Sequence, residues 1–219
     1  TYVVIATIVG ARLGHFLFYE RPSDYLKNPW EILRVWEGGL ASHGAVIGII
    51  LALILFRCRI RSKEPNLSII RLLDFLSLPA AFTAFCIRVG NFFNQEILGT
   101  RSNLPWAVVF GHPADHSFPL PRHPAQLYEA FAYLALFFLL WSCSYSKKFL
   151  QARGRFIGLF LIATFTFRFL IEFLKEEQSR LWSSSALTMG QILSLPCILA
   201  GFFLYFLSFR RVSRRASPF

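Results

Sequence analysis

Apolar residues dominate six stretches of this chain, and the polar side chains among them gather toward one end of the stretches. The apolar windows cover residues 1–19, 40–56, 66–87, 127–143, 156–174 and 187–209. Each window is near the length of about 20 residues that a helix needs to cross a bilayer. Leu, Ile, Val and Phe occur on all sides of the windows, which favours spanning helices over amphipathic surface helices. We therefore predict an all-α, polytopic integral membrane protein with about six transmembrane helices, folded as one domain over residues 1–219.

The distribution of Lys and Arg predicts the orientation of these spans. One set of connections carries twelve basic residues, namely Arg57, Arg59, Arg61, Lys63, Lys147, Lys148, Arg153, Arg155, Arg210, Arg211, Arg214 and Arg215. The opposite connections, 20–39, 88–126 and 175–186, are longer and carry only eight. By the positive-inside rule the first set is cytoplasmic, and so are both ends of this chain. Residues 99–126 are rich in proline and lack helical periodicity, which predicts a small extracytoplasmic head with an extended segment at 106–110.

Composition agrees with a membrane protein and argues against other classes. The chain is 55% hydrophobic and 16% charged, against about 25% charged for a soluble domain. Its net charge of +11 lies in short runs beside apolar spans, so we expect a lipid bilayer as its surroundings and no nucleic-acid partner. The four cysteines form no C-x-x-C pair and are interpreted as small buried apolar residues.

Charged side chains near the ends of three spans are the candidates for chemistry. Arg88 and Asn91 stand at the end of the third span, Arg168 and Glu172 near the end of the fifth, and His43 near the start of the second. A charged group inside a bilayer is costly, so it is a functional-site hypothesis by default. Their convergence at one depth predicts a polar cavity for an anionic group.

Each candidate also has a structural interpretation. Arg88 could simply extend its guanidinium to the membrane interface, although Asn91 and Asn94 continue a polar face beyond it. Arg168 and Glu172 are four residues apart, so they could neutralise each other, or Arg168 could bind phosphate while Glu172 holds it in position. Both alternatives remain open on the sequence alone.

His43 and three further residues carry weaker signals. His43 is surrounded by glycines, which suits either a packed side chain or a proton acceptor next to a bulky ligand. Arg12 makes one face of the first span polar, while Gln126 and Tyr128 enter the fourth span either as interfacial anchors or as a cavity wall. Arg71 and Asp74 are three apart and are interpreted as a structural pair.

Several motifs, in order along nearly the whole chain, resemble the prolipoprotein diacylglyceryl transferase family. They are Gly-Ala-Arg12-Leu-Gly, Trp-Glu-Gly-Gly-Leu-Ala-Ser-His43-Gly, Arg88-Val-Gly-Asn91-Phe-Phe-Asn94-Gln-Glu96-Ile-Leu-Gly99, Arg122-His-Pro-Ala-Gln-Leu-Tyr128-Glu129, Arg168-Phe-Leu-Ile-Glu172-Phe and Met189-Gly-Gln-Ile-Leu-Ser194. The third block is similar to the family's signature and is the most specific.

The resemblance implies an enzyme of the bacterial cytoplasmic membrane, active on its extracytoplasmic side. It would transfer the diacylglyceryl group of phosphatidylglycerol to the lipobox cysteine of a prolipoprotein signal peptide and release glycerol 1-phosphate. The implied catalytic residues are His43, Arg88, Arg168 and Glu96. The implied substrate-binding residues are Arg88, Asn91, Asn94, Gly99, Arg168, Glu172, Arg12, Gln126 and Tyr128. We expect no metal and no organic cofactor, because a phosphate leaving group allows displacement in one step.

The sequence also departs from that family. Family members carry a further N-terminal span with a functionally relevant tyrosine, so we expect this sequence to be cut short there. Thr164 stands where the family often has tyrosine, and Lys175-Glu-Glu-Gln178 replaces the usual Arg-Glu-Pro-Asp. Two other classes remain as alternatives: a transporter or channel for an anionic solute, and a lipid-binding scaffold without catalysis.

Overall fold

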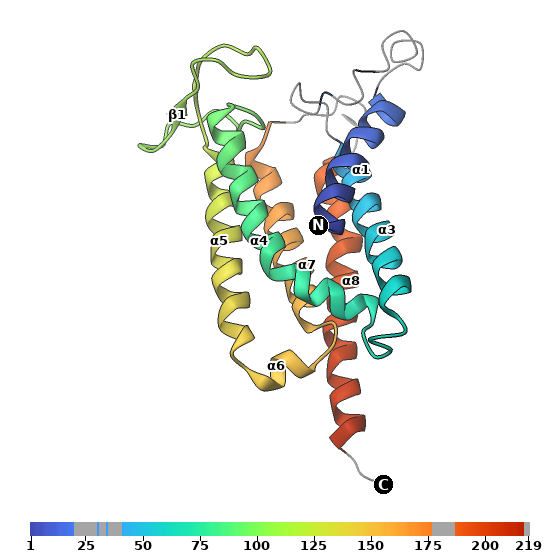
Figure 1. Ribbon diagram of the computed structural model, residues 1–219. Coiled ribbons are helices and arrows are strands. Elements are labelled where there is room, and N and C mark those ends of the chain that lie inside the picture. The colour runs from blue at the N-terminus through green and yellow to red at the C-terminus, as the bar shows by residue number, and fades with distance from the viewer. Residues whose placement is uncertain (20–29, 31–33, 35–40, 177–186, 217–219) are drawn as a thin grey trace. The chain divides into compact units, whose positions relative to one another are not determined.

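The computed structural model describes residues 1–19, 30, 34, 41–176 and 187–216, and this part of the chain is mainly helical (Figure 1). Its elements are α1 (Tyr2–Tyr19), α3 (Ser42–Ile60), α4 (Ile69–Phe93), β1 (Val108–Val109), β2 (Pro121–Arg122), α5 (Ala125–Ser144), α6 (Lys147–Gln151), α7 (Arg155–Ile171), the 3₁₀ turn η3 (Glu172–Leu174) and α8 (Met189–Ala216). Each of the six predicted apolar windows coincides with a helix, so the predicted helical class is confirmed.

Length and surface chemistry identify the helices as those of a multi-pass membrane protein. Four are long and apolar enough to cross a bilayer: Ile69–Phe93, Ala125–Ser144, Arg155–Leu174 and Met189–Phe209. Their outward faces expose large apolar side chains such as Phe138, Leu199 and Phe203. Contiguous apolar surface of this kind is unfavourable in water and favourable against lipid, where a helix also satisfies its own backbone groups.

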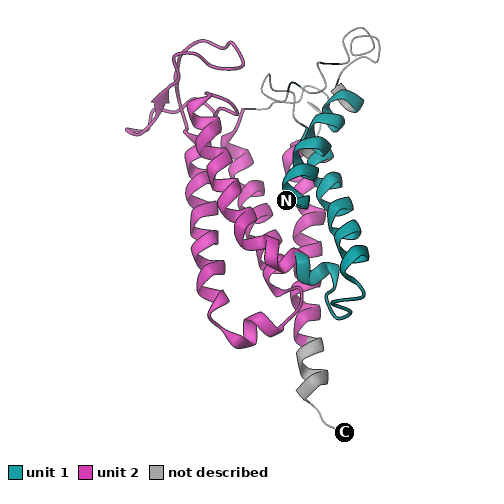
Figure 2. Ribbon diagram, viewed as in Figure 1, with its two compact units in different colours: residues 1–72 teal, residues 73–219 magenta. Residues whose placement is uncertain are grey.

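Backbone contacts group the chain into two compact units, residues 1–72 and 73–219 (Figure 2). In the first unit, α1 and α3 pack closely because glycines face each other across the helix pair. A Cβ atom added at Gly10 would overlap the carbonyl oxygen of Gly44, and one added at Gly44 would overlap that of Gly10. The small-x-x-x-small spacing therefore allows the two backbones to touch.

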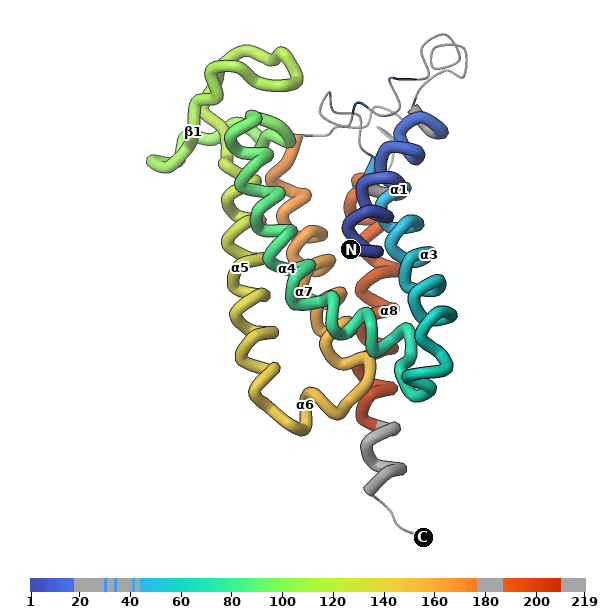
Figure 3. The backbone as a smooth tube through the Cα atoms, in the orientation of Figure 1, coloured from blue at the N-terminus to red at the C-terminus, as the bar shows by residue number. Residues whose placement is uncertain are grey.

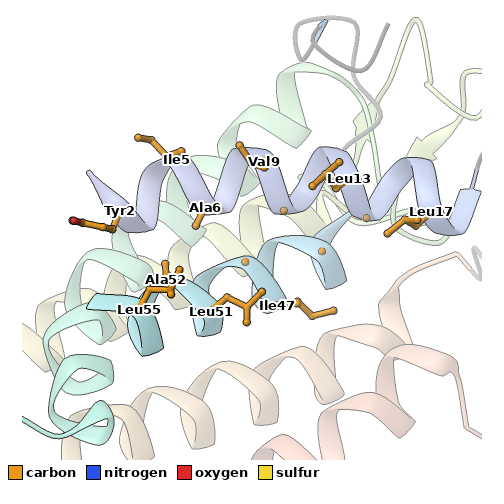
Figure 4. Close-up of a pocket in the computed structure, with 14 residues that line it drawn as sticks. Tyr2, Ile5, Ala6, Val9, Leu13, Leu17, Ile47, Leu51, Ala52 and Leu55 are labelled. Carbon is orange, nitrogen blue, oxygen red and sulfur yellow. The ribbon is translucent and has the colours of Figure 1, made fainter. Parts of the chain in front are cut away.

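The α1–α3 pair also lines an apolar groove of about 490 Å³ (Figure 4). Val9 and Leu13 line it from α1, and Ile47 and Leu51 line it from α3. No charged side chain is among its lining residues, so the groove suits hydrocarbon and cannot by itself bind an anion.

In the second unit, α7 and α8 pack along their lengths and α5 packs against α7. Ala81, Leu136, Leu140 and Phe156 form the buried apolar core of this unit. The buried carboxylate of Asp74 accepts hydrogen bonds from the backbone N–H groups of Gly154 (2.7 Å) and Ile157 (3.0 Å). Asp74 thus satisfies donors at the start of α7 and complements the positive end of the helix dipole.

The backbone between α4 and α5 forms a small head, whose path Figure 3 shows. Strands β1 and β2 pair antiparallel, with Val108 opposite Arg122, and β1 lies in the extended segment predicted at 106–110. Isolated bridges join Arg101 to Arg122 and Gly99 to Lys175. The head is therefore attached to the segment that follows α7. Its extracytoplasmic location stays a prediction, as does the single domain over 1–219.

Candidate active site

The end of α4 and the turn after it bring the predicted signature residues together. Arg88 donates from Nη1 to the Asn91 side-chain oxygen at 3.2 Å. Asn91 donates to Glu96 Oε2 at 2.7 Å, and Asn94 donates to Glu96 Oε1 at 3.3 Å. Each carboxylate oxygen of Glu96 is thus engaged by an amide, so Glu96 orients Asn91 and, through it, Arg88.

A strained turn aims Glu96 at these amides. Gln95 and Ile97, which flank it, both have φ of 55°. This left-handed region is unfavourable for a β-branched residue such as Ile97, and such strain persists only where the surroundings impose it. Here Gln126 Nε2 donates to the Glu96 carbonyl at 2.6 Å, and the Gln95 side chain accepts from the backbone N–H of His112 at 2.7 Å.

Glu129, which the sequence analysis did not place among the site residues, is the buried centre of the cluster. Its side chain is 0% exposed. Arg88 Nε lies 3.1 Å from its Oε2, and the two groups form an ion pair. The N–H group of Arg88 is not aligned for a hydrogen bond to this oxygen. Lys175 Nζ lies 3.0 Å from its Oε1, to which the Tyr133 hydroxyl also donates at 3.4 Å. Its signals in the sequence were its place at the end of the family-like motif from Arg122 to Glu129 and its spacing of three residues from Gln126.

Arg88 on α4 and Arg168 on α7 both lie close enough to Tyr133 of α5 to interact with it electrostatically. The charges of both guanidinium groups act on the Tyr133 hydroxyl. Within residues 1–19, 41–176 and 187–216, no hydrogen bond or ion pair engages the Arg168 side chain. A guanidinium has five N–H donors and is costly to leave unpaired in a membrane-spanning helix. Arg168 is therefore the group with most capacity for an incoming anion.

In the described part of the chain, Glu172 does not form an ion pair with Arg168. The mutual neutralisation that their spacing of four residues allowed is therefore not seen there. Helix α7 ends at Ile171, and Glu172 begins the 3₁₀ turn that follows. Its carboxylate lies 3.7 Å from Lys175 Nζ and against α8, where a Cβ atom added at Gly190 would overlap it. The carboxylate thus pairs with the lysine three residues later.

The head fixes the position of Lys175. The backbone N–H of Thr100 donates to the carbonyl of Leu174 at 2.9 Å, and that of Glu176 donates to Leu98 at 3.2 Å. Gly99 lies so close to His123 that a Cβ atom there would overlap the His123 carbonyl oxygen. Burial lowers the pKa of Lys175 and the Arg88 charge lowers it further, while Glu129 and Glu172 oppose the shift.

The other predicted residues occupy different positions. The Tyr128 hydroxyl accepts from Trp106 Nε1 at 2.8 Å, at the base of the head. Arg12, in the first unit, is buried with its guanidinium 4.8 Å from the centre of the Phe16 ring. His43 lies in the first turns of α3, and its side chain is outside the described residues. The participation of Arg12 and His43 in the site therefore stays a prediction.

The site as described contains three cations and three carboxylates and could hold an anion between its guanidinium groups. The cations are Arg88, Arg168 and Lys175, and the carboxylates are Glu96, Glu129 and Glu172. Among the described residues, no group of three His, Cys, Asp or Glu side chains could hold a metal ion. The fold and the cluster together define a multi-pass membrane protein with a cationic site near one end of its helices.

The chain belongs to the prolipoprotein diacylglyceryl transferase family, because the sequence model described as "Prolipoprotein diacylglyceryl transferase" matches residues 1–207. Curated relatives are named phosphatidylglycerol–prolipoprotein diacylglyceryl transferase. The protein of Protochlamydia amoebophila is 50% identical over 91% of this chain and 53% of its own length. That of Tolumonas auensis is 45% identical over 98% of this chain and 79% of its own. That of Chlamydia caviae is 40% identical over 99% and 73%.

This chain thus spans about half the length of the Protochlamydia relative and about three quarters of the Chlamydia relative. The predicted resemblance to the family is confirmed. The roles predicted for individual residues in binding and catalysis stay predictions.

We expect Glu96→Gln to lower activity about 10- to 100-fold, because one oxygen becomes an NH₂ group facing an amide donor. The unsatisfied pair is expected to cost about 1–3 kcal/mol. Glu64→Gln, on an exposed connection, is the matched control and should retain wild-type kcat/KM. Wild-type kcat/KM in Glu96→Gln would show that the amide–carboxylate contacts do not orient Arg88.

Proposed function

We propose that this protein transfers the diacylglyceryl group of phosphatidylglycerol to the cysteine thiol of a prolipoprotein. Membership of the family and the names of the relatives support this function over transport of an anionic solute. The observation that carries the proposal at the level of the site is the proximity of Arg88 and Arg168 to Tyr133 of α5, with the Arg168 side chain unengaged within the described residues. A phosphodiester headgroup provides the anion that such a pair would bind.

The two arginines would bind the phosphate of the lipid, bidentately where the planar fork of each guanidinium allows it. During transfer, the bond between the glyceryl carbon and its phosphate oxygen breaks, and negative charge grows on the departing glycerol phosphate. Cations that are already in place stabilise this developing charge more than they stabilise the bound lipid, which lowers the barrier.

The sulfur of the substrate cysteine would form the new carbon–sulfur bond and lose its proton. A thiol with a pKa of about 8.5 is only a few per cent ionised at neutral pH, so a proton acceptor increases the rate. His43 is the candidate acceptor. Glu96 is the second candidate, but both its oxygens already accept amide hydrogens, which lowers its capacity for a further proton.

The proposal includes the membrane topology. Six spans, counting α1 and α3, would place both ends of this chain in the bacterial cytoplasm. The head and the arginine cluster would then lie on the extracytoplasmic side, where a signal peptide presents its lipobox cysteine. The twelve basic residues on the other set of connections, which would lie in the cytoplasm, support this orientation.

The direct test is lipid transfer by the protein in lipid nanodiscs that contain phosphatidylglycerol with a labelled diacylglyceryl group. We expect label to appear on a lipobox peptide with cysteine and not on the same peptide with serine, and glycerol phosphate to be released in equal amount. Release of glycerol phosphate without peptide, or movement of an anion across the membrane without transfer, would contradict the proposed function.

Arg168→Lys should lose most of the transfer activity, by about 100-fold or more in kcat, because an ammonium cannot reproduce the planar fork. Arg101→Lys, at an exposed position of the head, is the matched control and should keep wild-type turnover. Turnover of Arg168→Lys at the wild-type rate would rule out bidentate binding at this position.

His43→Gln separates the two candidate proton acceptors. We expect kcat to fall about 10²- to 10⁴-fold at neutral pH, with partial recovery as the pH rises toward the pKa of the thiol. His116→Gln, in the exposed part of the head, should behave as wild type. An unchanged rate and pH profile in His43→Gln would exclude His43 and leave Glu96 as the acceptor.

A further inference from the structure

Lys175 lies within ion-pair distance of two carboxylates, the buried Glu129 and the partly buried Glu172. Its Nζ atom is 3.0 Å from Glu129 Oε1 and 3.7 Å from Glu172 Oε2. The Lys175 side chain is only 6% exposed, although lysine is a flexible residue that normally extends into solvent. Burial of this kind indicates that the ammonium group has a fixed position.

The two carboxylates belong to opposite sides of the cluster. Glu129 lies on α5 and pairs with Arg88 of α4. Glu172 directly follows α7, which carries Arg168, and lies against Gly190 of α8. Among the described residues, Lys175 is the one cation within ion-pair distance of both carboxylates, so it connects the two parts of the site that carry the arginines.

The backbone of Lys175 is held from the head. Its bridge to Gly99, together with the two hydrogen bonds of Leu174 and Glu176 to the segment 98–100, places it beside a short extended pairing. The next residue, Glu176, forms an ion pair with the buried Arg122. Tertiary contacts with the head therefore hold the backbone of Lys175 in place.

We propose that Lys175 is a positioning residue that sets the separation of Arg88 and Arg168 for a single phosphate group. By compensating the Glu129 carboxylate, it keeps that carboxylate against Arg88 Nε. Arg88 then holds its Nε edge toward Glu129 and its Nη1 toward Asn91, which fixes the plane of the guanidinium group. Lys175 itself is surrounded by carboxylates and does not contact the substrate. This inference rests on the proposed function.

The test compares Lys175→Met, which removes the charge and keeps the aliphatic stem, with Lys175→Arg, which keeps a cation. We expect Lys175→Met to lose about 10- to 100-fold in kcat/KM for phosphatidylglycerol, as for a small displacement of a substrate-positioning group. Lys175→Arg should remain within about threefold of wild type, because a guanidinium can also bridge two carboxylates. Lys148→Met, at an exposed lysine, is the matched control.

A double-mutant cycle shows whether Lys175 acts through Glu129. Glu129→Gln should lower kcat/KM by a similar factor, and the double variant Lys175→Met/Glu129→Gln should be no worse than about twofold below Glu129→Gln alone. Losses that multiply would overturn the proposal, because they would mean that the two side chains act independently. Wild-type kcat/KM in Lys175→Met would also overturn it.

The pH profile keeps the test informative even where Lys175→Met does not fold. Lys175 faces Glu129, Glu172 and Arg88, and the Tyr133 hydroxyl shares the Glu129 oxygen with it. Lysine and tyrosine are the residue types here that exchange a proton in the alkaline range, and Lys175→Arg leaves Tyr133 unchanged, so a shift in that variant reports on Lys175. Since burial lowers its pKa, kcat/KM of the wild type should fall at a pH below the ordinary lysine value of about 10.4. Lys175→Arg should extend the active range to higher pH, and an unchanged alkaline limb would count against the proposal.

Failure of the inference is distinguishable from failure of the proposed function. Absence of lipid transfer by the wild-type protein would refute the function itself. Transfer by the wild type together with equal kcat/KM in Lys175→Met would refute only the positioning role.

Discussion

A carboxylate without solvent exposure sets the main constraint on this structure. Glu129 cannot remain ionised inside a helical membrane protein unless cations surround it, since desolvation of an unpaired charge costs several kcal/mol. Arg88 from α4 and Lys175 from the segment after α7 meet this requirement from opposite sides. The same contacts hold Arg88 and Lys175 on one carboxylate. Neutralisation of one buried charge therefore also positions cations of the proposed lipid site.

The head contributes rigidity to this arrangement. The backbone N–H of His112 in the head donates to the Gln95 side chain in the strained turn, and the segment 98–100 pairs with the backbone around Lys175. Preorganised charges stabilise a transition state without rearranging during the reaction. The proposed chemistry therefore also depends on this small loop structure, because it helps to determine where the side chains at the helix ends lie.

Much of the helical framework was predictable, and part of the site was too. Continuous apolar windows of near-spanning length predicted the helices, because a membrane helix must be apolar over its whole lipid-facing length. Arg88, Asn91, Asn94 and Glu96 were recognisable as one group since they are neighbours in sequence and meet within one turn. Glu172 was harder to interpret, because the helix that could have aligned it with Arg168 ends one residue earlier.

The sequence by itself determined the membrane class and the family and predicted two arginines for the site, since these depend on composition and on local motifs. Only the tertiary structure decided that Glu129, Tyr133 and Lys175 belong to the same site, because they come from separate segments and meet through packing of α5, α7 and the head. Local periodicity describes which face of a helix is polar. Periodicity contains no information on which charged residue, distant in sequence, will neutralise a charge on that face. In a medium of low dielectric constant, such pairs of charges determine where each charge can lie.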